Sequence, residues 1–318
     1  MNISTLRGFH PQQRTALTLG TFDGVHRGHR ALLERTVSWA REHGVLSVAF
    51  VFTQPPSNSL GIPKPLLLPV RKKLEKIAQI VEHVLAVEFP EVGEMAAEEF
   101  VRKILVEQLH IAHIVIGPDA RFGKNRQGNR ALLEELGARF GFSVEVVPPV
   151  TINQKIISST AIRESLLAGR LEEAHEMLGY APTLWGTVVH GDGRGRQLGY
   201  PTANLALDLN VLVPAPGVYA VRVLVKDSWR DGVLYIGSRA TFAHASPSIE
   251  VHIFETTEDL YGLELEVALL HRLRGDQRFD SLDALREQIE RDIDAAREVL
   301  HSLTSRASSP GAAYRTQR

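Results

Sequence analysis

Short apolar runs alternate with amphipathic stretches through the first half of the chain. The runs at 45–52 and 112–117 are almost continuously apolar, which is typical of strands buried on both faces of a sheet. Alternating strands and helices favour a doubly wound parallel sheet, the α/β, Rossmann-like class. The predicted strands are 15–20, 45–52, 83–89, 112–117 and 142–148, and the predicted helices are 27–42, 70–82, 96–109 and 127–140.

The pattern changes near residue 182, after two short predicted helices within 159–178. From there, short strands follow one another, separated by Gly, Pro and Asp. Between Ile249 and Ile253 apolar and polar residues alternate, which indicates an antiparallel strand with two different faces. We therefore expect a small antiparallel β-barrel. Its predicted strands are 183–191, 217–225, 233–238, 249–256 and 263–271.

One amphipathic helix closes the second half, and either Asp280 or Ser281 can cap its start. Its apolar stripe consists of Leu285, Ile289, Ala296 and Leu300. After residue 302 the chain is small and polar, which predicts a flexible tail. The expected organisation is a first domain at 1–181, a second at 182–302 and a tail at 303–318.

Composition narrows the class of protein. At about 150 residues per domain, 318 residues agree with two domains. Lys and Arg number 36 against 37 for Asp and Glu, so the broad basic field used in nucleic-acid binding is missing. There is no cysteine, which excludes disulfides and thiol chemistry, and no apolar stretch of membrane-spanning length. We expect a cytoplasmic enzyme with neither nucleic-acid nor membrane partners.

A glycine-rich turn joins the first predicted strand to the first predicted helix. It reads GTFDGVHRGH from Gly20 and includes Phe22, Gly28 and two histidines, His26 and His29. Ligands bind at this position in doubly wound sheets, and the start of a helix attracts phosphate. Histidines there can donate hydrogen bonds to a phosphoryl group as charge builds on it. An isolated histidine is more often simply solvated, but H-x-G-H at a strand–turn–helix junction favours a nucleotide site.

The H-x-G-H form resembles the nucleotidyltransferase superfamily, which transfers AMP from ATP onto a phosphate or carboxylate. A second element of that superfamily is expected near the end of the domain. The segment ISSTAIR supplies hydroxyls and a guanidinium at a helix start, from Ser159, Thr160 and Arg163, and these can hold a triphosphate. Taken alone, the segment is an ordinary helix cap. The sequence contains no P-loop motif.

A second candidate site lies in the barrel half. The loop from Gly191 through Gly195 to Asn204 is rich in Gly and Arg and can wrap a nucleotide. Thr202 and Asn204 offer neutral oxygens that suit Mg²⁺ when nucleotide phosphates supply the negative charge. Glu250 lies on the alternating strand, where a fixed carboxylate can accept a proton from an attacking hydroxyl. The alternatives are a solvated turn and a solvent-facing glutamate.

Four motifs in order resemble one family. They are GTFDGVHRGH, IGPDARFGKNRQGN at 116–129, ISSTAIRESLLAG, and VVHGDGRGRQLGYPTANL in the second half. Together they are similar to the prokaryotic bifunctional riboflavin kinase/FMN adenylyltransferases, also called FAD synthetases. The resemblance implies a nucleotidyltransferase domain followed by a six-stranded riboflavin kinase barrel, with riboflavin, FMN and ATP as substrates and Mg²⁺ as the cofactor.

The resemblance also implies roles for individual residues. His26 and His29 would stabilise the α-phosphate transition state, and Glu250 would be the catalytic base of the kinase. Gly20, Phe22, Gly28, Ser159, Thr160, Arg163, Gly191 and Gly195 would bind nucleotide. Thr202 and Asn204 would bind the magnesium nucleotide. Asp119, Phe122, Gly123, Tyr261 and Arg274 would form the flavin sites.

Five positions depart from the family pattern. Pro55 stands where the loop after the third strand commonly has His, and Ala120 where an aromatic residue is usual. Tyr180 replaces a usual Arg, and Tyr235 and Ala240 replace the Asn and Pro of the barrel motif. One alternative is a riboflavin kinase with a decayed adenylyltransferase half; another is a non-catalytic module that senses flavin or nucleotide.

Overall fold

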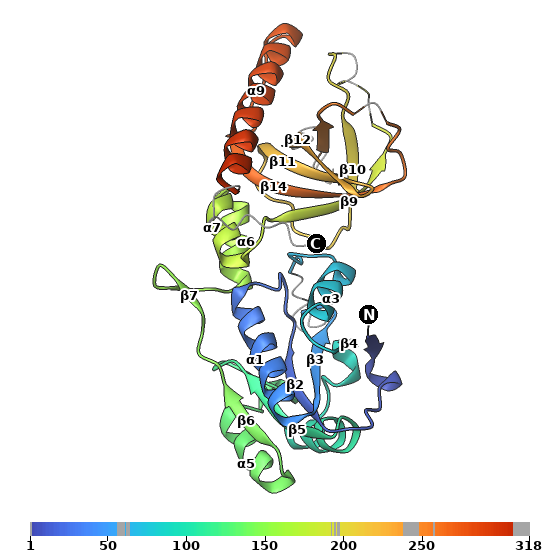
Figure 1. The fold of residues 1–318 in the computed structure, drawn as a ribbon, viewed down its shortest axis with the longest axis vertical. Helices are drawn as coiled ribbons and strands as arrows, with labels where there is room; N and C mark the ends of the chain where they lie inside the picture. Colours follow the sequence, from blue (N-terminus) through green and yellow to red (C-terminus); the bar gives the residue numbers. More distant parts are fainter. Residues whose placement is uncertain are drawn as a thin grey trace. The chain divides into compact units, whose positions relative to one another are not determined.

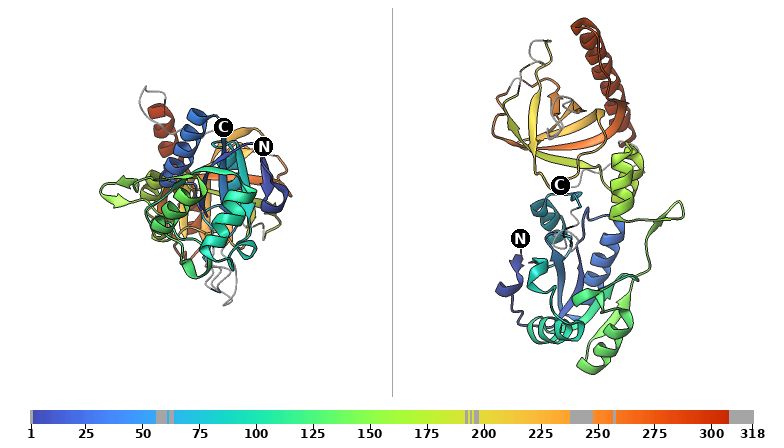
Figure 2. Two further views of the ribbon diagram at one scale, coloured as in Figure 1. Left: turned by 90° about the horizontal axis from the view of Figure 1, so that it is seen from below. Right: turned by 180° about the vertical axis from the view of Figure 1, so that it is seen from behind.

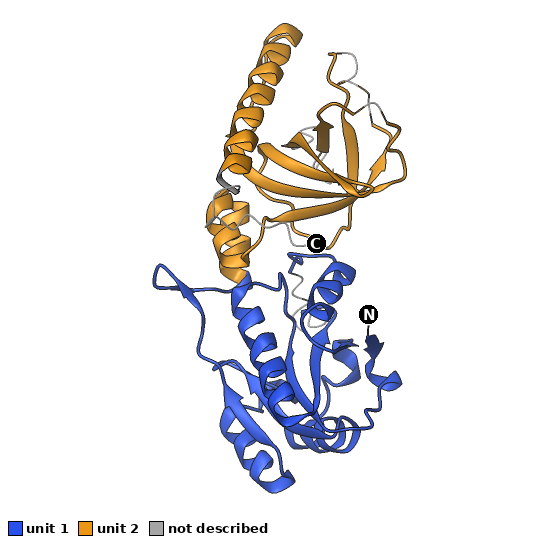
Figure 3. Ribbon diagram, in the orientation of Figure 1, with its two compact units in different colours: residues 1–159 blue, residues 160–318 orange. Residues whose placement is uncertain are grey.

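A computed structural model describes residues 2–55, 61, 64–191, 193, 195, 198–237, 248–256 and 258–307 (Figure 1). The chain forms two compact units, residues 1–159 and 160–318, coloured separately in Figure 3. The predicted domain boundary near 182 remains a prediction about the division of function. The two short helices before it pack within the second unit, where Ala215 N donates to Leu166 O at 3.0 Å.

The first unit is built on a six-stranded parallel sheet in the order β1-β4-β3-β2-β5-β6. Its strands are β1 (Ile3–Thr5), β2 (Thr15–Gly20), β3 (Leu46–Phe52), β4 (His83–Val87), β5 (Ile111–Ile116) and β6 (Ser143–Val146). The doubly wound prediction is confirmed. The sequence pattern missed β1, because its three residues lie at an edge of the sheet and alternate too briefly to be recognised.

Helices cover both faces of this sheet, as the views in Figure 2 show. α1 (Arg27–His43) packs on β2 and β3, and α3 (Val70–Ala78) packs on β4. The opposite face buries an apolar cluster beneath α4 (Ala97–Phe100), the π-helix Val101–Gln108 and α5 (Arg130–Phe140). The short helical segments are Leu6–Gly8, Phe89–Glu91 and Lys124–Arg126, and β7 (Thr151–Ile152) pairs with β8 (Lys155–Ile156).

β2 lies where the order of the sheet reverses. The chain passes from β2 to β3 and β4 on one side, and later returns to β5 and β6 on the other. Such a switch point leaves a crevice at the carboxyl ends of the strands, where doubly wound sheets bind their ligands. The glycine turn that follows Gly20 therefore begins at the expected ligand-binding edge.

The second unit contains a closed antiparallel barrel in the order β10-β13-β12-β11-β14-β9. Its strands are β9 (Thr183–Val189), β10 (Ala203–Leu207), β11 (Gly217–Val225), β12 (Ser228–Gly237), β13 (Ser248–Ile253) and β14 (Glu264–Gly275). Two helices, α6 (Ser159–Leu167) and α7 (Leu171–Leu178), precede the barrel. The six-stranded barrel implied by the resemblance is confirmed.

α9 (Leu282–Ala307) packs on β11, β12 and β14. Its buried residues Ile293, Ala296 and Leu300 join Ala220 and Phe254 in one apolar cluster. Ser281 caps the helix, because its hydroxyl accepts from Ala284 N at 3.1 Å. The helix continues to Ala307, five residues into the segment predicted as a flexible tail, which itself remains a prediction.

Candidate active sites

The turn between β2 and α1 is held in an unusual backbone conformation. Phe22 and Val25 have φ values of 50° and 39°, and Gly24 has 83°. A β-branched residue rarely adopts a positive φ, so the surrounding packing must hold Val25 there. Both Phe22 and Val25 are buried, and Val25 N donates to Phe22 O at 3.0 Å. The turn thus fixes the direction in which α1 starts.

His26 is the N-cap of α1. Its Nδ1 accepts a hydrogen bond from His29 N at 3.2 Å, so the proton of the neutral ring is on Nε2. The two histidine rings stack, with centroids 3.5 Å apart and planes inclined by 16°. His29 Nδ1 is buried without a hydrogen-bond partner among the described residues. The H-x-G-H spacing therefore brings both imidazoles together at the start of a helix.

Both histidines are held neutral. Burial lowers the pKa of His26 to about 4. Burial also lowers the pKa of His29 well below 6.5, and the charge of Lys73 lowers it further, as would a proton on His26. At neutral pH the pair can therefore donate N–H hydrogen bonds, but neither ring is an imidazolium cation.

Two glycines of the motif leave room for these rings. A Cβ on Gly28 would lie 3.2 Å from the Cε1 and Nδ1 atoms of His26, which is tighter than most such contacts. A Cβ on Gly20 would lie 3.3 Å from the Phe22 ring, which itself contacts His29 edge-on. The glycines thus serve the packing of the histidine turn as well as any approach of a ligand.

The ISST segment meets the turn through Ser159. Its hydroxyl donates to the backbone oxygen of Asp23 at 2.8 Å, while Oδ1 of Asp23 accepts from Leu67 N at 2.9 Å. Thr160 and Arg163 follow on α6; Thr160 is exposed and Arg163 is partly buried. The structure therefore brings Ser159 to the same turn as His26.

The segment predicted for the flavin site of the first unit contains both exposed and buried residues. Asp119 is exposed, whereas Phe122 is only 8% exposed and packs in the core against Phe100. Gly123 has a φ of 71°, and a Cβ there would lie 2.6 Å from the Ala97 Cα, so only glycine fits. Phe122 and Gly123 thus shape this loop structurally.

Glu250 lies at the centre of the barrel site. Its Oε2 accepts from the Thr202 hydroxyl at 3.0 Å, and its Oε1 accepts from the Ser248 hydroxyl at 2.8 Å. Ile249 and Val251 are buried, so Glu250 faces the other side, as the alternation predicted. Asn204 on β10 and Tyr235 on β12 pair directly with Glu250, so the three side chains share one face.

The glycine loop lies close to these oxygen atoms. A Cβ on Gly191 would overlap the Asn204 side chain, and one on Gly195 would lie 3.1 Å from the Thr202 hydroxyl. The described residues contain no group of three His, Cys, Asp or Glu side chains that could bind a metal by itself. The neutral oxygens of Thr202 and Asn204 fit Mg²⁺ bound together with nucleotide phosphates.

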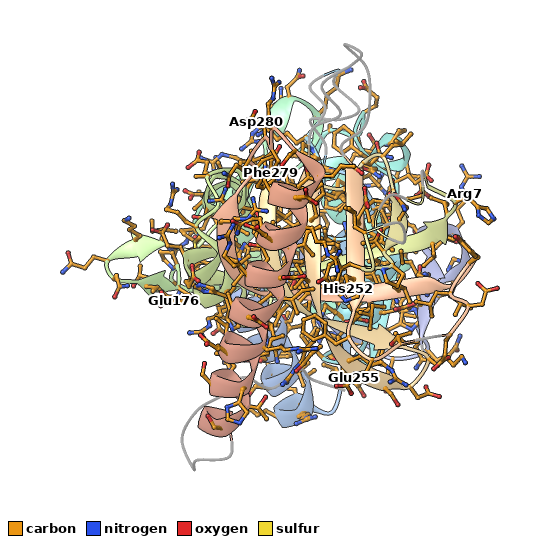
Figure 4. The ribbon with its side chains drawn as sticks, turned by 90° about the horizontal axis from the view of Figure 1, so that it is seen from above. Arg7, Glu176, His252, Glu255, Phe279 and Asp280 are labelled. Carbon is orange, nitrogen blue, oxygen red and sulfur yellow. The ribbon has the colours of Figure 1, made fainter. Side chains whose placement is uncertain are left out.

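The two residues predicted for the barrel's flavin site contact different parts of the unit. Tyr261 is 48% exposed and stacks on His190, with centroids 4.0 Å apart. Arg274 is bound by Asp292 of α9, with Nη2 to Oδ2 at 2.8 Å. It also lies over the ring of Phe279, which precedes α9 and is labelled with Asp280 in Figure 4. Arg274 thus connects β14 to α9.

The departures from the family pattern that fall on described residues lie in intact elements and loops. Tyr235 keeps β12 paired with β13 as far as Gly237 and Ser248, and its hydroxyl donates to Asp276 at 3.0 Å. Burial and the Asp276 carboxylate raise the pKa of Tyr235 to about 12. Pro55 is buried, and Ala120 and Tyr180 are partly buried. Ala240 lies outside the described residues.

Sequence reasoning missed three residues that contact these sites: Asp23, Lys73 and Ser248. Asp23 stood inside the quoted motif, so its buried, hydrogen-bonded carboxylate could have been suspected. Ser248 lies two residues before Glu250, which places it on the same face of a strand. The sequence does not indicate that Lys73 is buried, because it lies in the run Arg71, Lys72, Lys73, which is typical of a solvated helix face.

Comparisons with known proteins match both units. The FAD synthetase family matches residues 9–161, and the riboflavin kinase family matches residues 178–300. A bifunctional riboflavin kinase/FMN adenylyltransferase from Escherichia coli K12 is 38% identical over 303 residues, covering 92% of this chain and 96% of the relative. One from Bacillus subtilis 168 is 35% identical over 290 residues, covering 88% and 91%.

A solved structure shares the fold along nearly the whole chain. It is a crystal structure from Streptococcus pneumoniae titled as a macrolide-efflux protein, with a TM-score of 0.83 and 32% identity, covering 93% of this chain and 98% of that one. In the described part of our chain, no helix is long and apolar enough to cross a membrane.

Fold and matches together place the chain in the class of proteins that join a FAD synthetase unit to a riboflavin kinase barrel. It belongs to the family of bifunctional riboflavin kinase/FMN adenylyltransferases.

Proposed function

We propose that this protein makes FAD in two steps. The barrel phosphorylates riboflavin with ATP to give FMN, and the first unit transfers AMP from a second ATP to FMN, giving FAD and pyrophosphate. The observation that carries this proposal is that both family matches include a formed polar site: the stacked histidines in one, and Glu250 with its two hydroxyl donors in the other.

In the adenylyl transfer, an oxygen of the FMN phosphate attacks the α-phosphorus of ATP, and pyrophosphate leaves. The Nε2–H of His26 would donate to an α-phosphoryl oxygen, and the neutral ring of His29 would donate beside it. The start of α1 adds the positive end of a helix dipole. Ser159, Thr160 and Arg163 would hold phosphates, and neither histidine needs to exchange a proton.

In the kinase step, the terminal ribityl hydroxyl of riboflavin attacks the γ-phosphorus of ATP, and ADP leaves. Glu250 would accept the hydroxyl proton. The hydroxyls of Thr202 and Ser248 hold one carboxylate oxygen each, which fixes the base while leaving lone pairs free to take the proton. Thr202 and Asn204 would hold Mg²⁺, which neutralises phosphate charge when bound.

The remaining assignments complete this proposal. Asp119, Phe122 and Gly123 would bound the flavin site of the first unit, and Tyr261 and Arg274 that of the barrel. Gly20, Phe22, Gly28, Gly191 and Gly195 would shape the two nucleotide sites. The departures at Ala120 and Tyr235 would alter how flavin is held without removing any of the groups assigned to phosphate chemistry. A cytoplasmic location remains part of the proposal.

The test is turnover of the purified chain with riboflavin, ATP and Mg²⁺, with FMN and FAD separated by chromatography over time. We expect FMN to form first and FAD to accumulate from it. If FMN accumulates and FAD never forms, the adenylyltransferase half is inactive. If neither product forms, the result favours the alternative that the chain is a flavin- or nucleotide-sensing module.

A further inference from the structure

Lys73 is a buried cation that the proposed chemistry does not use. It lies on α3 with no exposed surface. Its Nζ donates to the backbone oxygen of Phe52 at 2.8 Å and to that of Thr53 at 3.0 Å. These two oxygens mark the carboxyl end of β3, the neighbour of β2 in the sheet. The ammonium group therefore lies at the same edge of the sheet as the histidine turn.

The charge of Lys73 acts on the histidine turn. It lowers the pKa of His29, while the charge of Asp23 partly offsets the effect of burial on Lys73. Burial lowers the pKa of Lys73 to about 8. Burying an ammonium group costs folding free energy. Hydrogen bonds to two backbone carbonyls offset this cost less than a paired carboxylate would. A role at the site would account for a charge kept in so unfavourable a place.

We propose that Lys73 is a positioning residue of the adenylyl-transfer site, which fixes the end of β3 beside the histidine turn and places a positive charge where it acts on His29. Part of the proposal rests on the proposed function: a cation at this edge also favours the negative charge of bound ATP phosphates. The effect on His29 does not depend on any activity.

The charged and titratable groups that act here come from three elements. Asp23 belongs to the turn after β2, His26 and His29 to the start of α1, and Lys73 to α3. Among the described residues, the end of β3 contributes carbonyl oxygens to Lys73. Loss of the ammonium charge would remove one of the causes that lower the pKa of His29, so that pKa would rise.

Three variants separate charge from packing. Lys73→Met removes the charge and keeps the length, and Lys73→Arg keeps a charge that does not titrate. Lys103→Met is the control, because it removes the same charge from an exposed lysine that pairs with Glu99 at 2.7 Å. In each variant, NMR of labelled histidines gives the pKa of His29, and FAD formation from FMN and ATP is measured from pH 6.5 to 9.5.

We expect Lys73→Met to raise the pKa of His29, while burial still holds it below 6.5, and to slow FAD formation at least tenfold, whereas Lys103→Met changes neither. The wild-type rate should decline as pH rises through about 8, where Lys73 loses its proton. In Lys73→Arg the rate should recover and this decline should disappear. If Lys73→Met does not fold, the wild-type decline and its absence in Lys73→Arg still decide the question.

An unchanged pKa of His29 in Lys73→Met overturns the proposal, as does a wild-type rate that stays flat above pH 8 or a decline that persists in Lys73→Arg. If the wild-type chain makes no FAD from FMN at any pH, the proposed function of this unit fails instead. In that case the NMR titration still decides whether the charge of Lys73 acts on His29.

Discussion

At the scale of single residues, the first unit keeps its two histidines uncharged. A hydrogen bond from the backbone of His29 fixes the tautomer of His26, and burial keeps both rings neutral. A neutral N–H donor can follow charge as it develops on a phosphoryl oxygen, without binding the ground state as strongly as a cation would. In the second unit the Glu250 carboxylate is also held in place, because each of its oxygens accepts a hydrogen bond from a hydroxyl.

Acid should destabilise the first unit through His26. Its pKa is about 4 when folded and 6.5 when unfolded, so between these values the unfolded chain binds a proton that the folded chain does not. Lowering the pH from 7 to 4 should therefore reduce the free energy of unfolding by about 3 kcal/mol through this residue. Trp39 fluorescence during urea unfolding, with Trp185 and Trp229 replaced by Phe, measures the change.

The matched control for this prediction is His26→Asn, since Asn is also a good N-cap but does not titrate. The wild type should lose about 3 kcal/mol more than His26→Asn over this pH range. Equal losses would show that His26 is not held neutral by folding.

The residue scale also shows where the sequence was insufficient. His26, His29 and Glu250 were predicted from spacing, because a motif at the start of a helix and alternation along a strand fix which way a side chain points. Lys73 could not be predicted, since its burial depends on packing between α3 and β3, which lie apart in the sequence. Asn204 was predicted as part of a turn, yet it is paired within β10.

At the scale of elements, close approach of the backbone organises both sites. α1 starts from a strained turn whose glycine leaves room for the His26 ring, and β10 brings Asn204 against the loop glycine Gly191. Most helices and strands could be predicted from periodicity. β10 could not, because its first two residues belong to the loop segment predicted to run through Pro201 to Asn204, and only three residues remain after it. The π-helix was predicted as an ordinary helix, since π-helical hydrogen bonding is rare and has no sequence signature of its own in this run.

Gly28→Ala should impair adenylyl transfer while the helix still forms. The new Cβ would lie 3.2 Å from the His26 ring and would displace it by a few tenths of an ångström, which should lower kcat for FAD formation at least tenfold. Gly8→Ala is the control, with 3.5 Å to its nearest neighbour. An unchanged rate in Gly28→Ala would show that the position of this ring does not limit the reaction.

Gly191→Ala should impair the kinase step. A Cβ at this position would overlap the Asn204 side chain, so Asn204 or the loop must move, and we expect FMN formation to fall by about 100-fold. Gly275→Ala, in the same barrel with 3.6 Å to its nearest neighbour, should retain activity. Kinetics with riboflavin and ATP measure both; equal rates would argue against a role for Asn204.

At the scale of the whole molecule, the chain joins two folds with separate cores and separate sites. The fold classes and their order could be predicted from the change in pattern near residue 182 and from four motifs. The contact boundary at 159/160 could not, because helices α6 and α7 continue the helical pattern of the first half while packing within the second unit. For this reason the apolar pattern alone does not locate the boundary between the two compact units.

Separate sites mean that each activity should be lost without the other, and one crossed assay tests this most directly. His29→Ala and Glu250→Gln are each given riboflavin or FMN, with ATP and Mg²⁺, and the products are separated by chromatography. His29→Ala should convert riboflavin to FMN and stop there. Glu250→Gln should make nothing from riboflavin yet convert supplied FMN to FAD. If either variant keeps both activities, or loses both while remaining folded, the assignment of one phosphate transfer to each unit is wrong.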